Sequence, residues 1–465
     1  MTHTRISKQL LLFNFFLFLS LSAFSQTDSK LSFLFAGDVM QHGGQIAGAY
    51  NKTTNSYDYD DGFKFVKPLI EEKDIAIANL EVTHAGKPYK GYPQFSAPDE
   101  LSKALLNAGF DILLTSNNHA CDGGAAGVVR TLDILDEVGI KHTGTFRNKA
   151  ERDENYPLII EEKGIKVALL NYTFSTNGIT VEAPVLINYI DSVTMKQDFA
   201  KAKKMNVDYI ICSLHWGTEY ESLPSSYQFF WEKFCYKQGA DMIVGGHPHV
   251  LQPVQKKIVN KKERLTIWSL GNFVSNQRDR YKNGGLMITA NICKEKNSPA
   301  FIDNVESCFT YVHIKQEGVL KPFYILPDFN YNEYRSDFIS PDELILMKQY
   351  FADSRKLFSE HSIGAKEKFV NSSPKIVDLY KDYLLGYYTV LIEKKSNSIL
   401  PSYSNKLHSY LHKIVYQDGS YGYVSGVFRT SEEAIGNKNF LLDCKIENKM
   451  KIIFVAPQEI KIIQE

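Results

Sequence analysis

Five short apolar runs that each end in polar residues constrain the fold of this chain most strongly. The polar residues at their ends are Asp38, Asn79 with Glu81, Asn118 with His119, His215, and His247 with His249. Short apolar runs of this kind predict buried β-strands. In open α/β sheets, ligands collect beyond the carboxyl ends of the strands, so these endings are expected to meet at one site. The pattern therefore predicts an α/β fold with a polar centre at its strand ends.

His247 and His249 are the most informative pair in the series. They flank Pro248, just past the apolar stretch 240–244. Two imidazoles separated by one residue can reach the same pocket, and imidazole is the commonest neutral ligand for zinc, iron and manganese-type sites. Two hydrogen-bonded loop histidines would be the default interpretation of this motif alone. The recurrence of similar strand endings upstream favours a metal site instead.

Further motifs follow one another in an uninterrupted order, namely 37–40, 79–81, 117–119 with Asp122 and Gly127, 215–220, 239–241, 247–253 and 269–273. In these motifs the chain resembles the CapA family of capsule or poly-γ-glutamate synthesis proteins. The catalytic domain of that family is similar to the calcineurin-like metallophosphoesterases. The resemblance covers over half of the chain, from about residue 31 to about residue 275. It implies a four-layer α/β/β/α sandwich and a metal-dependent hydrolase.

The resemblance also implies a set of site residues and one or two divalent ions, with Mn, Fe and Zn all open. The implied metal ligands are Asp38, Glu81, Asn118, His215, His247 and His249. Glu81, or less readily Asn79, would bridge the two ions, and His119 would act on the leaving group or the oxyanion. The residues expected to contact substrate or to orient ligands are Asn79, Glu219, Tyr220 and Asn272.

One position departs from the metallophosphoesterase pattern, because Met40 stands where Asp-x-His would place a histidine. A thioether is a poor ligand for hard metals, so the first ion is expected to be held weakly or to be absent. His42 could compensate, although a surface or supporting role is the expected one. His84 and His142 are also predicted to be structural, with His84 the stronger outside candidate because it follows Glu81 closely.

The N-terminus predicts export. Arg5 and Lys8 precede an apolar run over 10–21, and small residues follow up to Ser25, which is the pattern of a cleaved signal peptide over 1–25. The apolar run is shorter than the roughly 20 residues that cross a bilayer. We therefore expect a protein of the periplasm or cell envelope of a bacterium, with no transmembrane helix after cleavage. An uncleaved membrane anchor is the alternative.

Charge and cysteine content narrow the partners further. Lys and Arg number 53 and Asp and Glu number 53, without a long basic run, so no nucleic-acid partner is expected. The six cysteines lack CxxC spacing, which argues against a thiolate metal site and leaves their pairing open. The expected partner is an anionic envelope or capsule polymer, as the family resemblance implies.

The chain divides into four predicted parts: a signal peptide over 1–25, the metallophosphatase-like domain over 30–326, a helical extension with a linker over 327–400, and a small α+β unit over 401–465. The runs 265–270, 286–292 and 309–314 predict strands of a second sheet, and 342–393 predicts helix. The last unit weakly resembles SPOR domains, which bind peptidoglycan, through the stretch 426–434. A simple αβ cap that packs on the enzyme is an equal alternative.

Three functions remain open from the sequence. The leading one is an exported metal-dependent hydrolase acting in the biosynthesis or processing of a poly-γ-glutamate-type capsule or envelope polymer. The second is a phosphoester hydrolase of the envelope. The third is a non-catalytic factor that binds polymer during assembly. The complete ligand set favours an enzyme, because a binding scaffold has no need of it.

Overall fold

The computed structural model describes residues 29–315, 321–328 and 338–368, positions 435 and 438, and five further strands. These strands are β20 (Tyr387–Glu393), β21 (Leu411–Val415), β22 (Tyr421–Phe428), β23 (Met450–Ala456) and β24 (Glu459–Gln464). The predicted signal peptide lies outside the described residues. Among the helices that are described, none is long and apolar enough to cross a membrane.

The first sheet has the strand order β18-β17-β16-β1-β4-β5-β6, with β15 beside β1 and β19 beside β17. Strands β1, β4, β5, β6 and β15 run parallel, whereas β16, β17 and β18 pair antiparallel. The bounds are β1 Ser29–Val39, β4 Ile75–Leu80, β5 Ile112–Leu114, β6 Lys141–Thr143, β15 Asn272–Val274, β16 Gly284–Lys294, β17 Phe301–Ile314, β18 Phe323–Pro327 and β19 Lys366–Glu367.

The second sheet has the order β13-β14-β12-β11-β9-β8. Its central strands β9, β11, β12 and β14 are parallel, and β8 and β13 pair antiparallel at the two edges. The bounds are β8 Leu158–Glu162, β9 Ile165–Thr173, β11 Tyr209–His215, β12 Met242–Gly246, β13 Leu251–Val259 and β14 Lys262–Leu270.

Helices and two small hairpin-like sheets complete the described part of the chain. The helices are α2 Gly43–Ala49, α3 Asp60–Phe63, α4 Lys67–Ile70, α5 Glu100–Asn107, α6 Gly124–Val138, α7 Lys149–Asn155, α8 Ser192–Lys204, α9 Ser226–Gln238 and α10 Pro341–His361. The small sheets pair β2 (Tyr50–Asn51) with β3 (Ser56–Tyr57), and β7 (Thr145–Phe146) with β10 (Leu186–Ile187).

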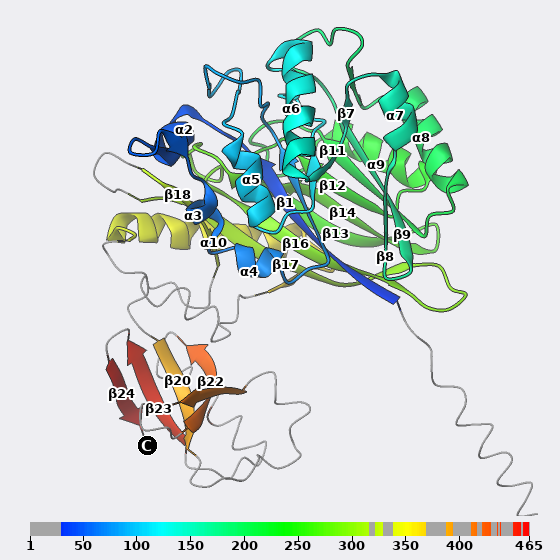
Figure 1. The fold of residues 1–465 in the computed structure, drawn as a ribbon. Helices are drawn as coiled ribbons and strands as arrows, with labels where there is room; N and C mark the ends of the chain where they lie inside the picture. Colours follow the sequence, from blue (N-terminus) through cyan, green and yellow to red (C-terminus); the bar gives the residue numbers. More distant parts are fainter. Residues whose placement is uncertain are drawn as a thin grey trace, which may run out of the picture.

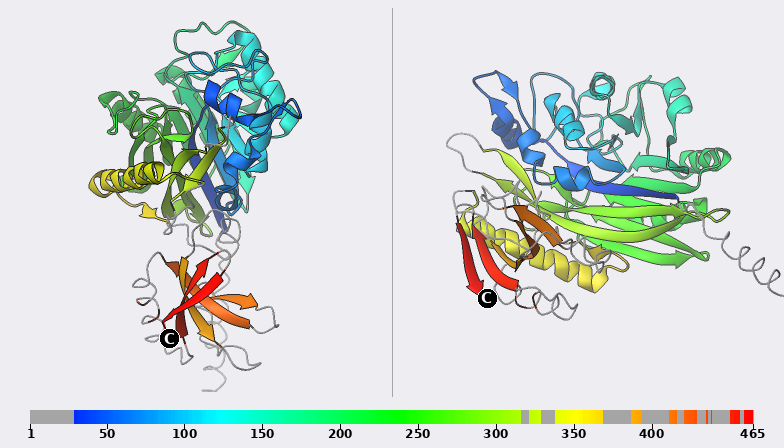
Figure 2. Two further views of the ribbon diagram at one scale, coloured as in Figure 1. Left: turned by 90° about the vertical axis from the view of Figure 1, so that its left-hand side faces the viewer. Right: turned by 60° about the horizontal axis from the view of Figure 1, so that its bottom comes forward.

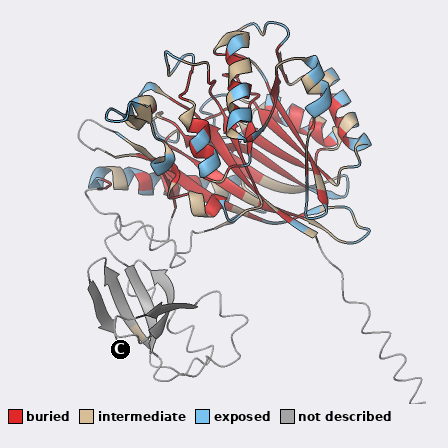
Figure 3. Ribbon diagram, in the orientation of Figure 1, coloured by how far each residue is buried: buried red, intermediate tan, exposed pale blue. Residues whose placement is uncertain are grey.

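The two sheets pack face to face and helices cover their outer faces (Figures 1 and 2). Along β11, alternate side chains enter two different cores: Ile211 joins the core between the sheets, whereas Ile210 and Cys212 join the core under α8 and α9. This alternation explains why the strand reads as one continuous apolar run, since both of its faces are buried. Figure 3 shows the buried residues concentrated on these strands. The architecture is the α/β fold class that the resemblance implied.

The predicted membership of the second sheet was wrong in part. The runs 286–292 and 309–314 lie in β16 and β17, which extend the first sheet beside β1, and only 265–270 lies in the second sheet, as part of β14. The register of β16 against β1 pairs Phe33 with Ala290 and Phe35 with Ile288. Pairing of this kind joins residues far apart in the chain, so strand propensity alone could not assign the sheet.

The helix predicted over 342–393 was also wrong at 362–368 and at 387–393, whereas residues 369–386 lie outside the described residues. Helix α10 begins after Ser340, whose side chain accepts the Glu343 N–H, and it ends at His361. Residues 387–393 form strand β20 instead, because Tyr, Thr, Val and Ile at these positions favour a strand. Met347 and Phe351 belong to the core between the sheets, so α10 is part of the main domain and the boundary predicted near residue 327 is not where that domain ends.

The C-terminal strands form an antiparallel sheet of order β21-β22-β20-β23-β24. The strand predicted at 421–428 is confirmed as β22, and the one predicted near 451–456 is confirmed as β23. The unit includes β20 and therefore begins before the predicted boundary at 401. The helix predicted to open near residue 430 lies outside the described residues, apart from helical positions 435 and 438.

We predict that Gly37→Ala destabilises the fold at the position that leads into Asp38. A Cβ at residue 37 would lie 2.1 Å from the carbonyl oxygen of Gly271, which also accepts the Asp38 N–H at 2.9 Å. Overpacking of this kind costs about 1–3 kcal/mol, which denaturant unfolding measures. Gly43→Ala is the control, because its Cβ would meet nothing within 4 Å. An equal loss of stability in both variants would contradict the prediction.

Candidate metal centre

Strand ends from both sheets build one buried polar cluster. Asp38 lies at the end of β1, and Glu81 and Asn118 follow β4 and β5 of the same sheet. His215 ends β11, and His247 and His249 follow β12 of the second sheet. The structure thus brings together all six residues predicted as ligands, and each of them is buried. They come from the carboxyl ends of two facing sheets, a point that strand endings alone did not reveal.

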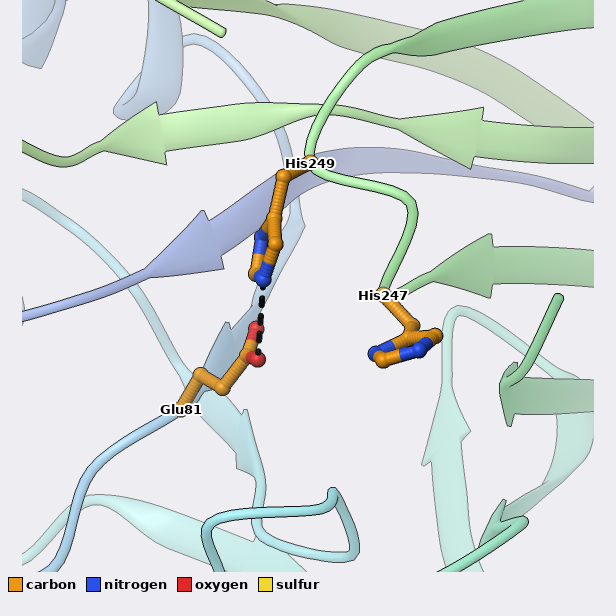
Figure 4. A group of neighbouring side chains, drawn as sticks. All are labelled: Glu81, His247 and His249. Carbon is orange, nitrogen blue, oxygen red and sulfur yellow. Dashed lines mark ion pairs between the residues drawn. The ribbon is translucent and has the colours of Figure 1, made fainter. Parts of the chain in front are cut away.

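Glu81 lies at the middle of the cluster. Its Oε1 is 3.5 Å from His215 Nε2 and 3.6 Å from His249 Nε2, and Figure 4 shows the His249 ring pointing at this carboxylate. Two groups have ligand atoms that all lie within 4.8 Å of one another, Glu81 with His247 and His249, and Glu81 with Asp38 and His215. Glu81 is shared by both groups, which is the position of a bridging carboxylate.

Asn79 holds the carboxylates in place. Its Nδ2 donates to Asp38 Oδ1 at 2.8 Å and to Glu81 Oε2 at 3.3 Å. Its Oδ1 accepts a hydrogen bond from Asn117 Nδ2 at 3.2 Å, and the same Asn117 amide donates to the Leu80 carbonyl at 2.7 Å. Asn79 therefore orients ligands, which was one of the two roles expected of it. Asn117 was not singled out from the sequence, although it precedes the predicted ligand Asn118.

The amide groups of Asn118 and Asn272 face two different histidines. Asn118 Oδ1 lies 2.7 Å from His215 Nε2. Asn272 Oδ1 lies 3.1 Å from His249 Nδ1, which is also 3.3 Å from Asp38 Oδ2. The Asn272 amide nitrogen donates to the Lys282 carbonyl at 2.8 Å, so its oxygen stays turned toward the histidine. The roles of Asn118 as a ligand and of Asn272 as a site-lining residue remain predictions. The distances to His215 and His249 are consistent with both roles.

The charges of the cluster shift several pKa values. Burial alone would raise the pKa of Asp38, but the hydrogen bond and charge of His249 with the charge of His215 lower it to about 2. Burial alone would lower the pKa of His249, but the carboxylates of Glu81 and Asp38 raise it to about 9. Burial and the neighbouring imidazoles lower the pKa of His247 well below its usual value. The buried carboxylates thus require positive charge beside them.

Two unpartnered atoms indicate where a cation fits. His247 Nδ1 and Glu81 Oε1 are buried and make no hydrogen bond. Buried polar groups in folded proteins almost always have a partner, so such atoms at one point call for an ion or a water. The donors are imidazole nitrogens, carboxylate oxygens and an amide oxygen, which suit Mn, Fe or Zn. The residues present therefore fit one or two divalent ions.

His119 is held beside the cluster by a residue whose role the sequence did not reveal. Its Nδ1 lies 2.7 Å from Asp122 Oδ2, and the same oxygen accepts the Phe95 N–H at 2.7 Å. The Phe95 ring contacts the imidazole edge-on at 4.6 Å between centroids. Asp122 was part of a motif without an assigned role, and the structure shows that it fixes the ring of His119 and leaves Nε2 for proton transfer. In the sequence, the signal for this contact was that Asp122 follows His119 by three residues.

Glu219, Tyr220 and Phe174 lie at the exposed edge of the cluster. Glu219 is exposed, and the Tyr220 ring is 47% exposed with its centroid 6.2 Å from that of His249. Phe174 was missed by the sequence analysis, and its ring lies 4.5 Å from that of His247. These side chains are placed where a substrate would approach the buried ligands.

Three further histidines considered from the sequence have partners outside the cluster. His84 is buried, with Nε2 2.7 Å from Ser102 Oγ, and His142 Nε2 lies 2.9 Å from Asp136 Oδ1. His42 Nδ1 lies 3.2 Å from Gln45 Oε1, and His42 is in neither group of candidate ligands found among the described residues.

Cys121, Cys212, Cys235 and Cys308 form no disulfide bond, and Cys444 lies outside the described residues. Cys212 and Cys235 face each other in the core under α9 with sulfur atoms 4.0 Å apart. The two groups of candidate ligands found among the described residues consist of histidines and carboxylates.

The fold and the site together define a class: a two-sheet α/β sandwich whose strand ends form one buried carboxylate and imidazole centre. The chain belongs to the bacterial capsule synthesis protein family PGA_cap, which matches residues 32–277.

Two relatives give the scale of the similarity. The chain is 33% identical over 262 residues to the capsule biosynthesis protein CapA of Bacillus anthracis, which covers 54% of this chain and 61% of the relative. It is 31% identical over 265 residues to the PGA biosynthesis protein CapA of Bacillus subtilis (strain 168), which covers 54% of this chain and 65% of the relative. The match thus spans about three-fifths of the length of these relatives.

Solved structures resemble this one more distantly. The NAD nucleotidase of Haemophilus influenzae aligns with a TM-score of 0.42 and 14% identity, covering 77% of this chain and 67% of the other. The calcineurin-like phosphoesterase YfkN of Bacillus subtilis aligns with a TM-score of 0.38 and 14% identity, covering 71% and 98%.

We predict that the metal-free protein loses stability as the pH rises through 9, because of His249. Its folded-state pKa of about 9 lies above the ordinary value of 6.5, so its contribution is complete below pH 6.5 and is lost as the pH rises through 9. The loss is on the order of 2–3 kcal/mol, measured as the free energy of unfolding against pH. His249→Gln should remove this slope, and the control His142→Gln should keep it. A slope that survives in His249→Gln would refute the assignment.

Proposed function

We propose that this protein is an exported metal-dependent hydrolase that acts on a capsule or cell-envelope polymer. The observation that carries the proposal is the position of Glu81, which lies within reach of His215 on one side and His249 on the other. Membership of the PGA_cap family supports the capsule context. The names of the two relatives, which concern capsule and PGA biosynthesis, make a poly-γ-glutamate-type polymer the first substrate to test.

The ligands divide around Glu81 into two sides. Asp38 and His249 lie on one side, 3.3 Å apart, and Asn118 and His215 lie on the other, 2.7 Å apart. His247 belongs to the ligand group of Glu81 and His249, and its ring also lies 4.9 Å from that of His215, so its unpartnered Nδ1 would be available to an ion on either side. A divalent ion bound here would supply Lewis acidity and lower the pKa of a water that it binds. Mn, Fe and Zn all suit this donor set. The second side has the more complete set of ligands, because Met40 replaces a histidine on the first.

His119 would move the proton of the reaction. With its Nδ1 proton donated to Asp122, neutral His119 would accept at Nε2 the proton that the attacking water loses, and the imidazolium would then pass that proton to the leaving group as its bond breaks. Asp122 keeps the tautomer and the ring orientation fixed, and it stabilises the imidazolium that forms. The Phe95 N–H, which also donates to Asp122, holds that carboxylate in place. This arrangement serves an amide nitrogen and a phosphoester oxygen equally well as leaving group.

Export and polymer binding by the C-terminal unit are parts of the same proposal. The apolar N-terminal run over 10–21 supports export to the periplasm or cell envelope. The antiparallel sheet of β20 to β24 is a separate set of strands from the two sheets that hold the site, and we propose that it binds the polymer or peptidoglycan. A protein whose centre holds no ion and turns over no substrate would instead be an assembly factor.

We predict that His119→Ala lowers the hydrolytic rate by about 10²–10⁴ while the metal content of the protein is unchanged, since His119 moves protons and binds no ion. The substrates are poly-γ-glutamate and bis-p-nitrophenyl phosphate, each assayed with protein that lacks residues 1–25. The matched control is His142→Ala, a histidine that pairs with Asp136 away from the centre. A rate in His119→Ala equal to that of the control would exclude the proposed role.

A further inference from the structure

Two tyrosines near the candidate centre share an unusual backbone conformation. Tyr220 has φ 67° and Tyr281 has φ 76°, which is the left-handed region that bulky residues rarely adopt. Their side chains are 47% and 39% exposed, so burial of the rings does not explain the strain. The backbone N–H of Tyr220 donates to the Pro248 carbonyl at 2.8 Å, which fixes the residue beside the two histidines that flank that proline. Strain of this kind persists where the surrounding structure enforces it, and it concentrates at functional sites.

Tyr281 lines a groove with a volume of about 360 Å³. Ser222 and Leu251 line it, and these residues follow Tyr220 and His249 in the chain by two positions each. The far wall is the face of α10 that carries Asp353, Lys356 and Glu360. A volume near 360 Å³ lies within the range of pockets that hold small molecules or one unit of a polymer.

The loop that carries Tyr281 is tied to the site at two points. The Lys282 ammonium lies 4.2 Å from the centre of the Tyr220 ring, so the two tyrosines stand on neighbouring parts of one surface. The Lys282 carbonyl accepts the hydrogen bond of Asn272, whose oxygen faces His249. The groove and the candidate metal centre are therefore parts of one continuous arrangement.

The charges of the groove do not suit a polyanion. Its ionisable lining residues other than tyrosine are the bases Arg280 and Lys356 and the acids Asp353 and Glu360, so their formal charges cancel. Arg280 also donates to Asp353 at 3.2 Å, which leaves its positive charge locally compensated. A poly-γ-glutamate segment would gain little attraction here. A neutral ligand gains more, because it can stack on an exposed aromatic ring and exchange hydrogen bonds with paired charged groups.

We propose that this groove binds a pyranose ring of a glycan, stacked on the face of the Tyr281 ring opposite the Arg280 guanidinium, which lies 5.0 Å from the ring centre. The hydroxyl groups of the sugar would hydrogen-bond to Arg280, Asp353 and Ser222. The inference rests on the proposed function in one respect, that the bound glycan belongs to the capsule or cell-envelope polymer on which the enzyme acts. Poly-γ-glutamate, which has no sugar ring, would not fill this groove.

The test measures binding without turnover, on metal-free full-length protein. The probes are chitotetraose, maltotetraose and poly-γ-glutamate of similar length, followed by saturation-transfer NMR and calorimetry. We expect at least one neutral tetrasaccharide to bind, and Tyr281→Ala to weaken this binding about tenfold or more. Tyr281→Gly should do the same while relieving the left-handed strain, so a folding defect is separated from a loss of stacking. Tyr227→Ala, an exposed tyrosine on α9 with 40% exposure, is the matched control and should bind normally.

Three results would overturn the inference: binding of poly-γ-glutamate alone, no binding of either tetrasaccharide at millimolar concentration, or binding that Tyr281→Gly leaves intact. None of these results concerns hydrolysis or metal content, so the proposed function can fail while the groove binds sugar, and the reverse also holds.

Discussion

The buried negative charge of Asp38 and Glu81 is the constraint on which the rest of the site depends. Both side chains are fully buried, and carboxylates in the interior are stable only beside opposite charge or strong hydrogen-bond donors. The chain supplies His215 and His249 as charge partners and Asn79 as a donor to both carboxylates. The carboxylates raise the pKa of His249 to about 9, and the proton that His249 then holds occupies the same electrostatic position as a divalent cation. A proton on His249 and a bound metal ion would thus each supply the positive charge that the two carboxylates need. The fold creates this need because it joins the two sheets at the carboxyl ends of their strands.

Close approach of the backbone makes this joining possible. A Cβ on Gly245 would lie 2.0 Å from the Trp268 carbonyl oxygen, and one on Gly246 would lie 2.8 Å from Asp38 Oδ1. The two histidines that follow have positive φ, 96° at His247 and 57° at His249, so the loop turns sharply and points both rings at the carboxylates. The β12 end therefore brings the second sheet against the first sheet within the site itself. Strain and close packing are concentrated where the ligands converge, in keeping with a site that the surrounding core holds in shape.

The sequence predicted local features well and non-local pairing poorly. Helix α9 is an example of a local feature, because its capping box at Ser225 and the left-handed Gly239 that ends it are encoded within a few residues of its ends. The convergence of Asp38, Glu81, Asn118, His215, His247 and His249 was also predictable, since strand ends and family motifs both indicate it. The sheet of β16 and β17 was not, because antiparallel addition beside β1 depends on partners more than two hundred residues away. The roles of Asp122, Phe174 and Tyr281 became visible only from their contacts, because single polar or aromatic residues carry no distinctive local pattern.

Metal content is the measurement that tests the account most directly. Elemental analysis of protein lacking residues 1–25, purified beside His247→Ala, asks whether the orphaned Nδ1 of His247 and the shared Glu81 carboxylate hold an ion. The account predicts one or two divalent ions per wild-type chain and a loss of at least one in the variant, while its helical and strand content is unchanged. Wild-type protein that binds no Mn, Fe or Zn, even after reconstitution with each, would contradict the central claim that this buried cluster is a metal centre.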